Sequence, residues 1–268
     1  MQYTSLNTKA SVCMVPRGVN GWPLERVATD AGELWFPLAD KVMREYARNS
    51  GRWDIDVAKV LFDCCASQEQ GVFVDIGANV GYFSCLLSER FHDLRTFAFE
   101  PHPLIYDVLA LNTWKYGSRI QLHSCALGSK RGTVALETAT NNLGDTRGVE
   151  EDVANTVAPL VSLDELYPDL VASVVKIDVQ GAELDVIRGM VGVIRRSPSI
   201  RIVVEFSPDL AIADHFDPEV VLDVYRSLGM RVLLIRDGQL SEESNTEILR
   251  YCSSAGPMAQ ANLLLVRT

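Results

Sequence analysis

The chain has 268 residues, of which 47% are hydrophobic, and its formal net charge is −10 at pH 7. This length and composition can bury a full core and are consistent with one α/β domain that carries an extension. Lysine and arginine never occur in runs longer than two residues. The sequence therefore lacks the clustered basic surface that a general nucleic-acid binder needs.

No apolar run approaches the ~20 residues that cross a bilayer, and residues 1–4 lack the basic start of an export signal. The six cysteines form no C-x-x-C pair and have no histidine at zinc spacing, which predicts free thiols. We therefore expect a cytoplasmic protein that contacts no membrane or nucleic acid and has no metal site. Separated carboxylates can still meet in space, so the sequence leaves Mg²⁺ open.

Residues 1–70 are expected to precede the main domain as an arm and a helical lid. Proline and glycine recur between residues 16 and 23 and predict an arm or a short extended pairing. Residues 33–40 indicate a strand or packed loop, and helices are expected near 41–49 and 56–67. These helices either cover the ligand or only pack on the sheet. The arm is also the segment that we would assign to a homodimer contact.

Residues 72–84 read VFVDIGANVGYFS, an apolar strand that leads through a glycine turn into a helix near residues 82–89. Gly77 and Gly81 allow the backbone to pass close to a ligand, and Asp75 places a carboxylate where the strand ends. The start of the helix offers unpaired backbone N–H groups. This stretch predicts a site for a nucleoside-bearing cofactor. The alternative is a turn in which glycine only packs.

The order of these residues separates two cofactor classes. A nicotinamide site favours G-x-G-x-x-G, whereas this chain has D-x-G-x-N-x-G, with Glu100 and Pro101 after a likely strand at 95–99. The pattern resembles the class I S-adenosylmethionine-dependent methyltransferases. The resemblance implies that Asp75 lies near the methionine part of the cofactor. It also implies that Glu100 accepts hydrogen bonds from both ribose hydroxyls.

Strands and helices alternate from residue 72 onward, which predicts a mainly parallel sheet with helices on both faces. The last strand follows residues 230–235 without a clear intervening helix, so we expect it to be antiparallel. The predicted fold is α/β, of the Rossmann-like class I methyltransferase type, with seven strands in the main sheet and an N-terminal helical extension. The methyltransferase domain is expected over residues 71–268, as a single folding unit.

A polar segment at residues 137–156 joins two short predicted strands, 133–136 and 157–161. A loop of this length in a compact domain is usually functional or disordered. We expect it to face the substrate, with Asn141 and Asn142 as candidate contacts.

Six motifs occur in order between residues 75 and 206: DIGANVGYFS, FEPHP, CALG, LDEL, KIDVQGAE and VEF. Together they resemble the FkbM family of S-adenosylmethionine-dependent methyltransferases, and the resemblance runs from about residue 34 to about residue 206. It implies O-methylation, commonly of a sugar or secondary-metabolite hydroxyl. One departure is Gln180, where the family often has glutamate. A neutral amide keeps the hydrogen-bonding shape of that side chain but loses its charge.

The resemblance also implies site residues. Cys125 is either a cofactor contact or a small core residue, and His102 is either a substrate contact or part of a turn. The implied cofactor contacts are Asp75, Gly77, Asn79, Gly81, Glu100, Pro101, Asn112, Ser124, Cys125 and Ala126.

Transfer of a methyl group from a sulfonium to a hydroxyl needs alignment and a group that takes the proton. Asp178, at the end of its strand, is the candidate base or orienting group; the alternative is that it only caps nearby amides. Glu205 ends the next strand and is expected to interact with Asp178 by like-charge repulsion, while Lys176 opposes that effect. Lys176 can also be a structural ion-pair partner. The predicted catalytic residues are Asp178, Glu205 and Lys176.

The sequence thus predicts an S-adenosylmethionine-dependent O-methyltransferase that acts on a hydroxyl of a small molecule, such as a sugar, glycoside or polyketide-like metabolite. The alternatives are methylation of an amine or carboxylate by the same site, and a non-catalytic binding protein of the same fold.

Overall fold

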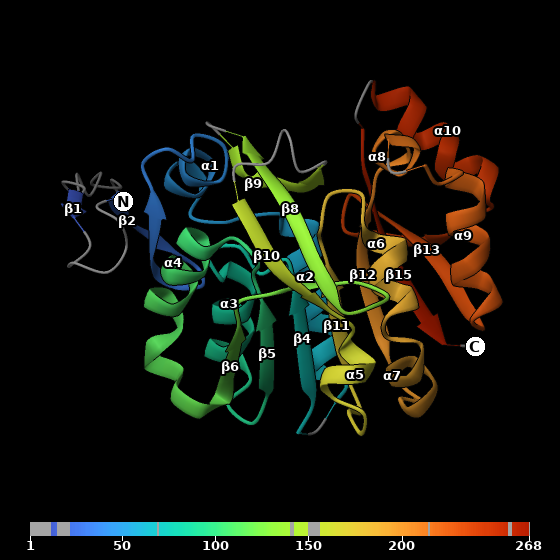
Figure 1. The fold of residues 1–268 in the computed structure, drawn as a ribbon, viewed down its shortest axis with the longest axis horizontal. Coiled ribbons are helices and arrows are strands. Elements are labelled where there is room, and N and C mark those ends of the chain that lie inside the picture. The colour runs from blue at the N-terminus through green and yellow to red at the C-terminus, as the bar shows by residue number, and fades with distance from the viewer. Residues whose placement is uncertain are drawn as a thin grey trace, which may run out of the picture.

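The computed structural model describes residues 12–14, 22–68, 70–139, 142–149, 156–213, 215–256 and 259–267. Its centre is a single large sheet with helices on both faces (Figure 1). The strands of this sheet are β4 (Val72–Ile76), β5 (Arg95–Phe99), β6 (Ile120–His123), β11 (Val174–Ile177), β12 (Arg201–Phe206), β13 (Met230–Arg236), β14 (Gln239–Glu242) and β15 (Ala261–Arg267).

The strand order is β14-β13-β15-β12-β11-β4-β5-β6. Neighbouring strands from β12 to β6 are parallel, whereas β15 is antiparallel to both β12 and β13. This confirms the predicted fold, with its antiparallel last strand. The short edge strand β14 adds an eighth member that the sequence analysis did not predict.

The reason given for the antiparallel last strand was wrong, because helix α10 (Asn245–Ala255) lies between β13 and β15. The chain reverses earlier, at a two-residue turn formed by Asp237 and Gly238, which both have positive φ. Such a turn joins antiparallel strands, and Asp-Gly is a preferred sequence for it. Both β14 and β15 are antiparallel to β13.

The side chains of each central strand alternate between two hydrophobic clusters, one on each face of the sheet. In β4, Phe73 packs in one cluster, whereas Val74 and Ile76 pack in the other. The first cluster includes side chains from α2 (Ile55–Ala66), α3 (Tyr82–Arg90) and α4 (Pro103–Thr113). The second includes side chains from α6 (Glu183–Arg188), α7 (Val191–Arg196), α8 (Pro208–Ala213), α9 (Pro218–Ser227) and α10.

The N-terminal extension contains a three-stranded antiparallel sheet as well as helices. Its strands are β1 (Val12–Met14), β2 (Pro23–Thr29) and β3 (Gly32–Pro37), and they precede α1 (Met43–Ser50) and α2. Leu24 and Phe36 are completely buried in the same cluster as α2, α3 and α4. The extension therefore shares a core with the main sheet.

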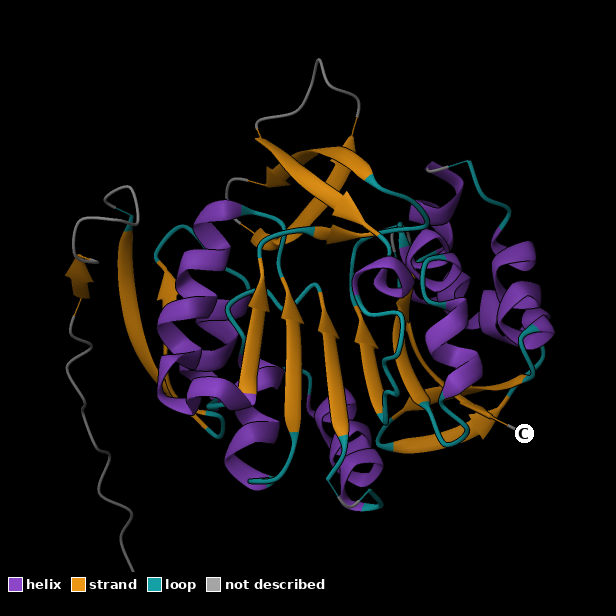
Figure 2. Ribbon diagram, turned by 60° about the horizontal axis from the view of Figure 1, so that its bottom comes forward, coloured by secondary structure: helices purple, strands orange, loops and turns teal. Residues whose placement is uncertain are grey.

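A second small sheet lies over the carboxyl ends of the central parallel strands (Figure 2). It consists of β7 (Ala126–Leu127), β8 (Gly132–Ala139), β9 (Asn142–Val149) and β10 (Thr156–Val161), in the order β7-β10-β8-β9. The predicted strands at 133–136 and 157–161 are present. The expectation that residues 137–156 form a loop was wrong in part, because β9 lies within this segment. An antiparallel strand with one face toward solvent does not need apolar residues throughout.

Among the described residues, no helix is long and apolar enough to span a membrane. Five cysteines, Cys64, Cys65, Cys85, Cys125 and Cys252, carry free thiols, and burial raises the pKa of each to about 11 or 12.

Asn112 connects the extension to the main domain. Its amide donates to the carbonyl oxygens of Trp35 (2.9 Å) and Val80 (2.8 Å), and its Oδ1 accepts from the Trp35 N–H (2.7 Å). The side chain is only 4% exposed. Three hydrogen bonds in a buried setting join β3, α4 and the turn before α3.

We expect Asn112→Ala to lower the free energy of unfolding by about 2–4 kcal/mol, because it leaves backbone groups of Trp35 and Val80 without their partner. Chemical denaturation measures this quantity. The control is Asn49→Ala on the exposed face of α1, which should change stability by less than about 0.5 kcal/mol. Equal stability of the two variants would show that the Asn112 bonds contribute nothing.

Candidate functional site

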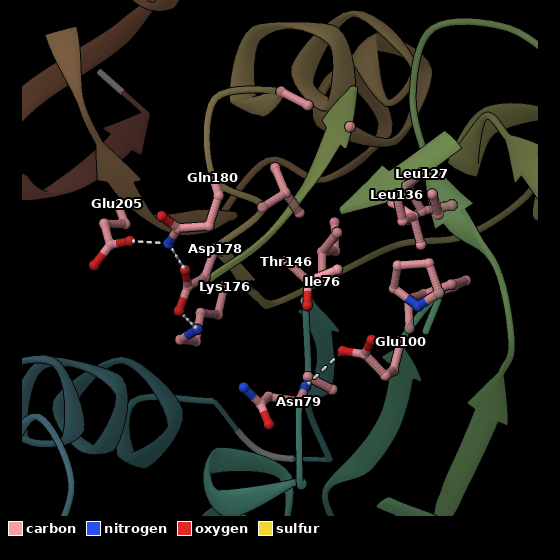
Figure 3. A pocket seen from close by; sticks show the side chains of 18 of the residues that line it. Ile76, Asn79, Glu100, Leu127, Leu136, Thr146, Lys176, Asp178, Gln180 and Glu205 are labelled. Carbon is pink, nitrogen blue, oxygen red and sulfur yellow. Dashed lines mark hydrogen bonds and ion pairs between the residues drawn. The ribbon is translucent and has the colours of Figure 1, made fainter. Parts of the chain in front are cut away.

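A cavity of about 480 Å³ lies where the central strands end, beneath the small sheet. Ligands of open α/β sheets bind at this edge, because the loops after the parallel strands leave a crevice there. Figure 3 shows the side chains that line it: Asn79 and Glu100 follow β4 and β5, Lys176 and Asp178 belong to β11 and its end, and Glu205 lies on β12.

The turn after β4 requires glycine for packing as well as conformation. Gly77 has φ +77°, and a Cβ at this position would lie 1.9 Å from the carbonyl oxygen of Asp178. Gly81 has φ +86°, and a Cβ there would lie 2.6 Å from Leu109. Gly77 lines the cavity, whereas Gly81 packs against α4 and is not part of the lining. Asn79, with φ +51°, also lines it.

Glu100 is only 4% exposed, and its two carboxylate oxygens are already held in place. One accepts from the Asn79 N–H (3.0 Å) and the other from the His102 N–H (2.9 Å). Burial raises the pKa of Glu100 to about 7, although these two backbone donors oppose the shift. A carboxylate has about four acceptor positions, so each oxygen retains room for one donor from a ligand.

Asp75 is completely buried and does not line the cavity. Its Oδ2 accepts from the Ser84 hydroxyl (2.6 Å), while its Oδ1 has no hydrogen-bond partner among the described residues. Burial raises the pKa of Asp75, and the charge of Lys176, its neighbour across the β4–β11 pairing, opposes this.

One end of the cavity has a largely apolar wall. Pro101, Cys125 and Ala126, all predicted cofactor contacts, line it. The small sheet closes this end, and the side chains of Leu127 and Leu136 are visible there in Figure 3. These apolar side chains suit a flat, weakly polar ring.

The other end of the cavity holds two carboxylates joined by amides. Lys176 Nζ lies 2.8 Å from Asp178 Oδ2. Gln180 Nε2 donates to Asp178 Oδ1 (3.0 Å) and to Glu205 Oε2 (2.7 Å). Gln260 Nε2 donates to the same Glu205 oxygen (3.0 Å) and to Gln180 Oε1 (3.2 Å). The predicted catalytic residues therefore meet in one hydrogen-bonded cluster.

The electrostatics of this cluster separate its two acids. Burial by itself would raise the pKa of Asp178, but the charge and hydrogen bond of Lys176 outweigh it, and the pKa is lowered. Burial and the negative charge of Asp178 raise the pKa of Glu205 well above its usual value. Burial lowers the pKa of Lys176, but Asp178 and Asp75 outweigh it, so that pKa is raised.

The N-terminal extension supplies part of the lining through Val42, Met43, Trp53 and Asp54. Asp54 caps helix α2 by accepting from the Val57 N–H (3.1 Å), and its other oxygen accepts from Asn262 (3.3 Å). Burial raises the pKa of Asp54.

Sequence reasoning missed Asp54 and Gln260. An aspartate before an apolar helix is a recognisable N-cap signal, but nothing in the local sequence places it at a cavity. Gln260 carries no local signal at all.

Five predicted site residues do not line the cavity. Besides Asp75 and Gly81, these are Asn112, which joins α4 to β3; Ser124, which is exposed; and His102, a buried residue whose ring lies 6.4 Å from that of Trp22. Asn142 begins β9, and Asn141 lies outside the described residues. The predicted residues that do line it are Gly77, Asn79, Glu100, Pro101, Cys125, Ala126, Lys176, Asp178 and Glu205.

Known proteins resemble this chain in sequence and in fold. A hexuronic acid methyltransferase, AglP of Haloferax volcanii, is 30% identical over 142 residues, which cover 52% of this chain and 57% of that protein. Methyltransferase 1 of Beauveria bassiana is 26% identical over 157 residues, covering 48% and 62%. The chain thus matches less than two thirds of the length of either relative. The crystal structure of a putative transferase from Pyrococcus horikoshii aligns with a TM-score of 0.49 and 10% identity, over 90% of this chain and 70% of that one.

The family model described as the methyltransferase FkbM domain matches residues 75–232, more than half of the chain. The matched range begins at Asp75 and contains Glu100, Asp178 and Glu205, so it includes both ends of the cavity. The chain belongs to the FkbM methyltransferase family.

Proposed function

We propose that the protein is an S-adenosylmethionine-dependent O-methyltransferase that acts on a hydroxyl of a small molecule such as a sugar or glycoside. The observation that carries this proposal is that one cavity has Glu100 at one end and Asp178 with Glu205 at the other. Glu100 offers acceptor positions to a diol, and Asp178 offers a carboxylate, held ionised, to an acceptor hydroxyl.

The described residues fit this cofactor. Glu100 has one acceptor position left on each oxygen, which matches the two ribose hydroxyls. The apolar wall around Pro101, Cys125 and Ala126 suits the adenine ring. When bound, S-adenosylmethionine supplies a methyl group activated by a positively charged sulfur.

The charge of the lining favours an acceptor that is uncharged or cationic. The described residues that line the cavity include one lysine and no arginine, and that lysine is paired with Asp178. An anionic acceptor would meet carboxylates with no free cation nearby. The relative from Haloferax volcanii is named for a hexuronic acid; we propose that this chain takes a neutral or amino-bearing acceptor instead. The carboxylates in the lining are Asp54, Glu100, Asp178, Asp185 and Glu205.

In the proposed reaction, Asp178 holds the acceptor hydroxyl and takes its proton as the new oxygen–carbon bond forms and the carbon–sulfur bond breaks. Lys176 keeps Asp178 ionised before the reaction. Trp53, Val42 and Met43 line the cavity from the extension and help to exclude water. The same carboxylates would attract a protonated amine, so methylation of an amine is the second candidate.

The first test is calorimetric titration of S-adenosylhomocysteine into wild type and Glu100→Ala. The variant should lose about 1.5–3 kcal/mol of binding free energy, as expected for hydrogen bonds to a charged group. Glu219→Ala, an exposed residue of α9, is the control and should bind like wild type. Folded wild-type protein that binds no cofactor would refute the enzyme proposal and favour a non-catalytic binding protein.

Cofactor binding should weaken in acid because of Glu100. Its pKa is about 7 in the free protein, and two hydroxyl donors favour the ionised form. Protonation competes with binding, so the dissociation constant should be constant above about pH 8 and rise about tenfold per pH unit below about pH 7. Titrations of S-adenosylhomocysteine across this range check the slope, which Glu100→Gln should abolish. A flat wild-type profile would contradict the assignment.

Asp178→Asn keeps the size of the side chain but cannot take a proton. We expect methyl transfer from labelled S-adenosylmethionine to fall by about 10²–10⁴-fold, with the affinity for S-adenosylhomocysteine within about threefold of wild type. Activity is measured on a panel of glucosides, glucosaminides and glucuronides, of which the glucuronides should be the poorest acceptors. Full activity of Asp178→Asn would remove Asp178 from the mechanism.

A further inference from the structure

Gln180 follows β11, and its amide group joins the two acids of the cavity. Its Nε2 has two hydrogens, and each has an acceptor: Asp178 Oδ1 at 3.0 Å and Glu205 Oε2 at 2.7 Å. Its Oε1 accepts from Gln260 (3.2 Å). The reverse orientation of the amide would direct its oxygen at two carboxylates, so these contacts define its orientation.

The backbone of Gln180 adds a second, independent observation. Its φ is +56°, in the left-handed region, where a residue other than glycine costs roughly 1–3 kcal/mol. Glycine would adopt this conformation freely. The hydrogen bonds of the side chain help to offset this cost, and its partners among the described residues are Asp178, Glu205 and Gln260.

Asp178 and Glu205 are partly buried, and two carboxylates that share one donor need hydrogen atoms or a cation between them. The charged groups that act on this pair are Lys176, Asp75, Asp54 and Glu100. Lys176 contacts Asp178 Oδ2, on the side opposite the amide contact. No group of three or more histidine, cysteine or acidic side chains within the described part of the chain is arranged to hold a metal ion.

We propose that Gln180 is a positioning residue that takes the place of a cation between Asp178 and Glu205. Its two N–H groups hold both carboxyl groups at the acceptor end of the cavity, so the site needs no divalent ion there. The residue at position 180 then determines whether this end of the cavity binds a divalent cation. Glutamate would bring three carboxylates together, which is a set of oxygen ligands suited to Mg²⁺ or Ca²⁺.

This inference rests on the proposed role of Asp178, but its test reads cation binding and stability rather than methyl transfer. The variants are Gln180→Glu and Gln180→Met, which keeps the length of the side chain without its donors. The control is Gln70→Glu, because Gln70 is exposed and also has a positive φ, +51°. Each protein is titrated with Mg²⁺ and with Ca²⁺, and its Tm is measured at about pH 5 and about pH 8.

Wild type and Gln70→Glu should bind neither cation, and their Tm should not respond to either. Gln180→Glu should bind Ca²⁺ with a dissociation constant of about 10⁻⁴–10⁻³ M. Its Tm should be about 5 °C lower than that of wild type at about pH 8, and Ca²⁺ should restore it. We expect the two neighbouring carboxylates to raise the pKa of the added carboxyl in the folded state. The variant therefore loses stability as the pH rises, and its loss relative to wild type is smaller at about pH 5.

If Gln180→Glu does not fold, the Tm of Gln180→Met tests the proposal. Removal of the donors raises the pKa of Glu205 further, so the loss in Tm should again be larger at about pH 8 than at about pH 5. A role in packing alone would give equal losses at both pH values and would overturn the proposal, as would saturable cation binding by wild type that Gln180→Met abolishes.

S-adenosylhomocysteine titration separates the two proposals. If Gln180→Met binds it within about threefold of wild type, the cofactor site is intact and the result concerns Gln180 alone. If wild type does not bind it, the proposed function fails, while the cation and pH results still judge the role of Gln180.

Discussion

The close approach of two backbone segments, at Gly77 and Asp178, determines the geometry of the cavity. The Asp178 N–H donates to the carbonyl oxygen of Ile76 (3.0 Å), and the missing side chain of Gly77 leaves room for the Asp178 carbonyl. This contact joins the turn that follows β4 to the turn that follows β11. Because Asn79 lies in the first turn and donates to Glu100, one chain of contacts connects both ends of the cavity.

The acidic side chains that line the cavity accept hydrogen bonds from two different kinds of donor. Backbone N–H groups donate to both oxygens of Glu100, and the remaining acceptor positions of these oxygens are available to a ligand in the cavity. Side-chain amides hold the acids at the other end: Gln180 contacts Asp178, Gln260 contacts Glu205, and Asn262 contacts Asp54. Neutral donors satisfy these partly buried carboxylates without the repulsion or attraction that further ions would add. Lys176, the one lysine among the described lining residues, forms its ion pair with Asp178, and its charge also acts on Asp75, Glu205 and Asp54.

The sequence predicted the features that depend on neighbouring residues. Gly77 and Glu100 belong to short motifs with a physical reason for each residue, and the alternation of strands and helices predicted the sheet. It could not predict Gln260, because that residue reaches the site only through the pairing of β15 with β12. Nor could spacing alone show that Asn112 bonds to Trp35, 77 residues away. The polar segment was misread because strand β9 has polar residues that resemble those of a loop.

The position of β15 also has a consequence for synthesis of the chain. This strand is the last one described, yet it lies between β12 and β13, and it is preceded directly by Gln260 and contains Asn262. While the ribosome is still making residues 261–267, the sheet has a gap in its interior and two unpaired strand edges. Such edges can pair with other chains. The nascent protein is therefore exposed to aggregation until the residues that complete its cavity emerge.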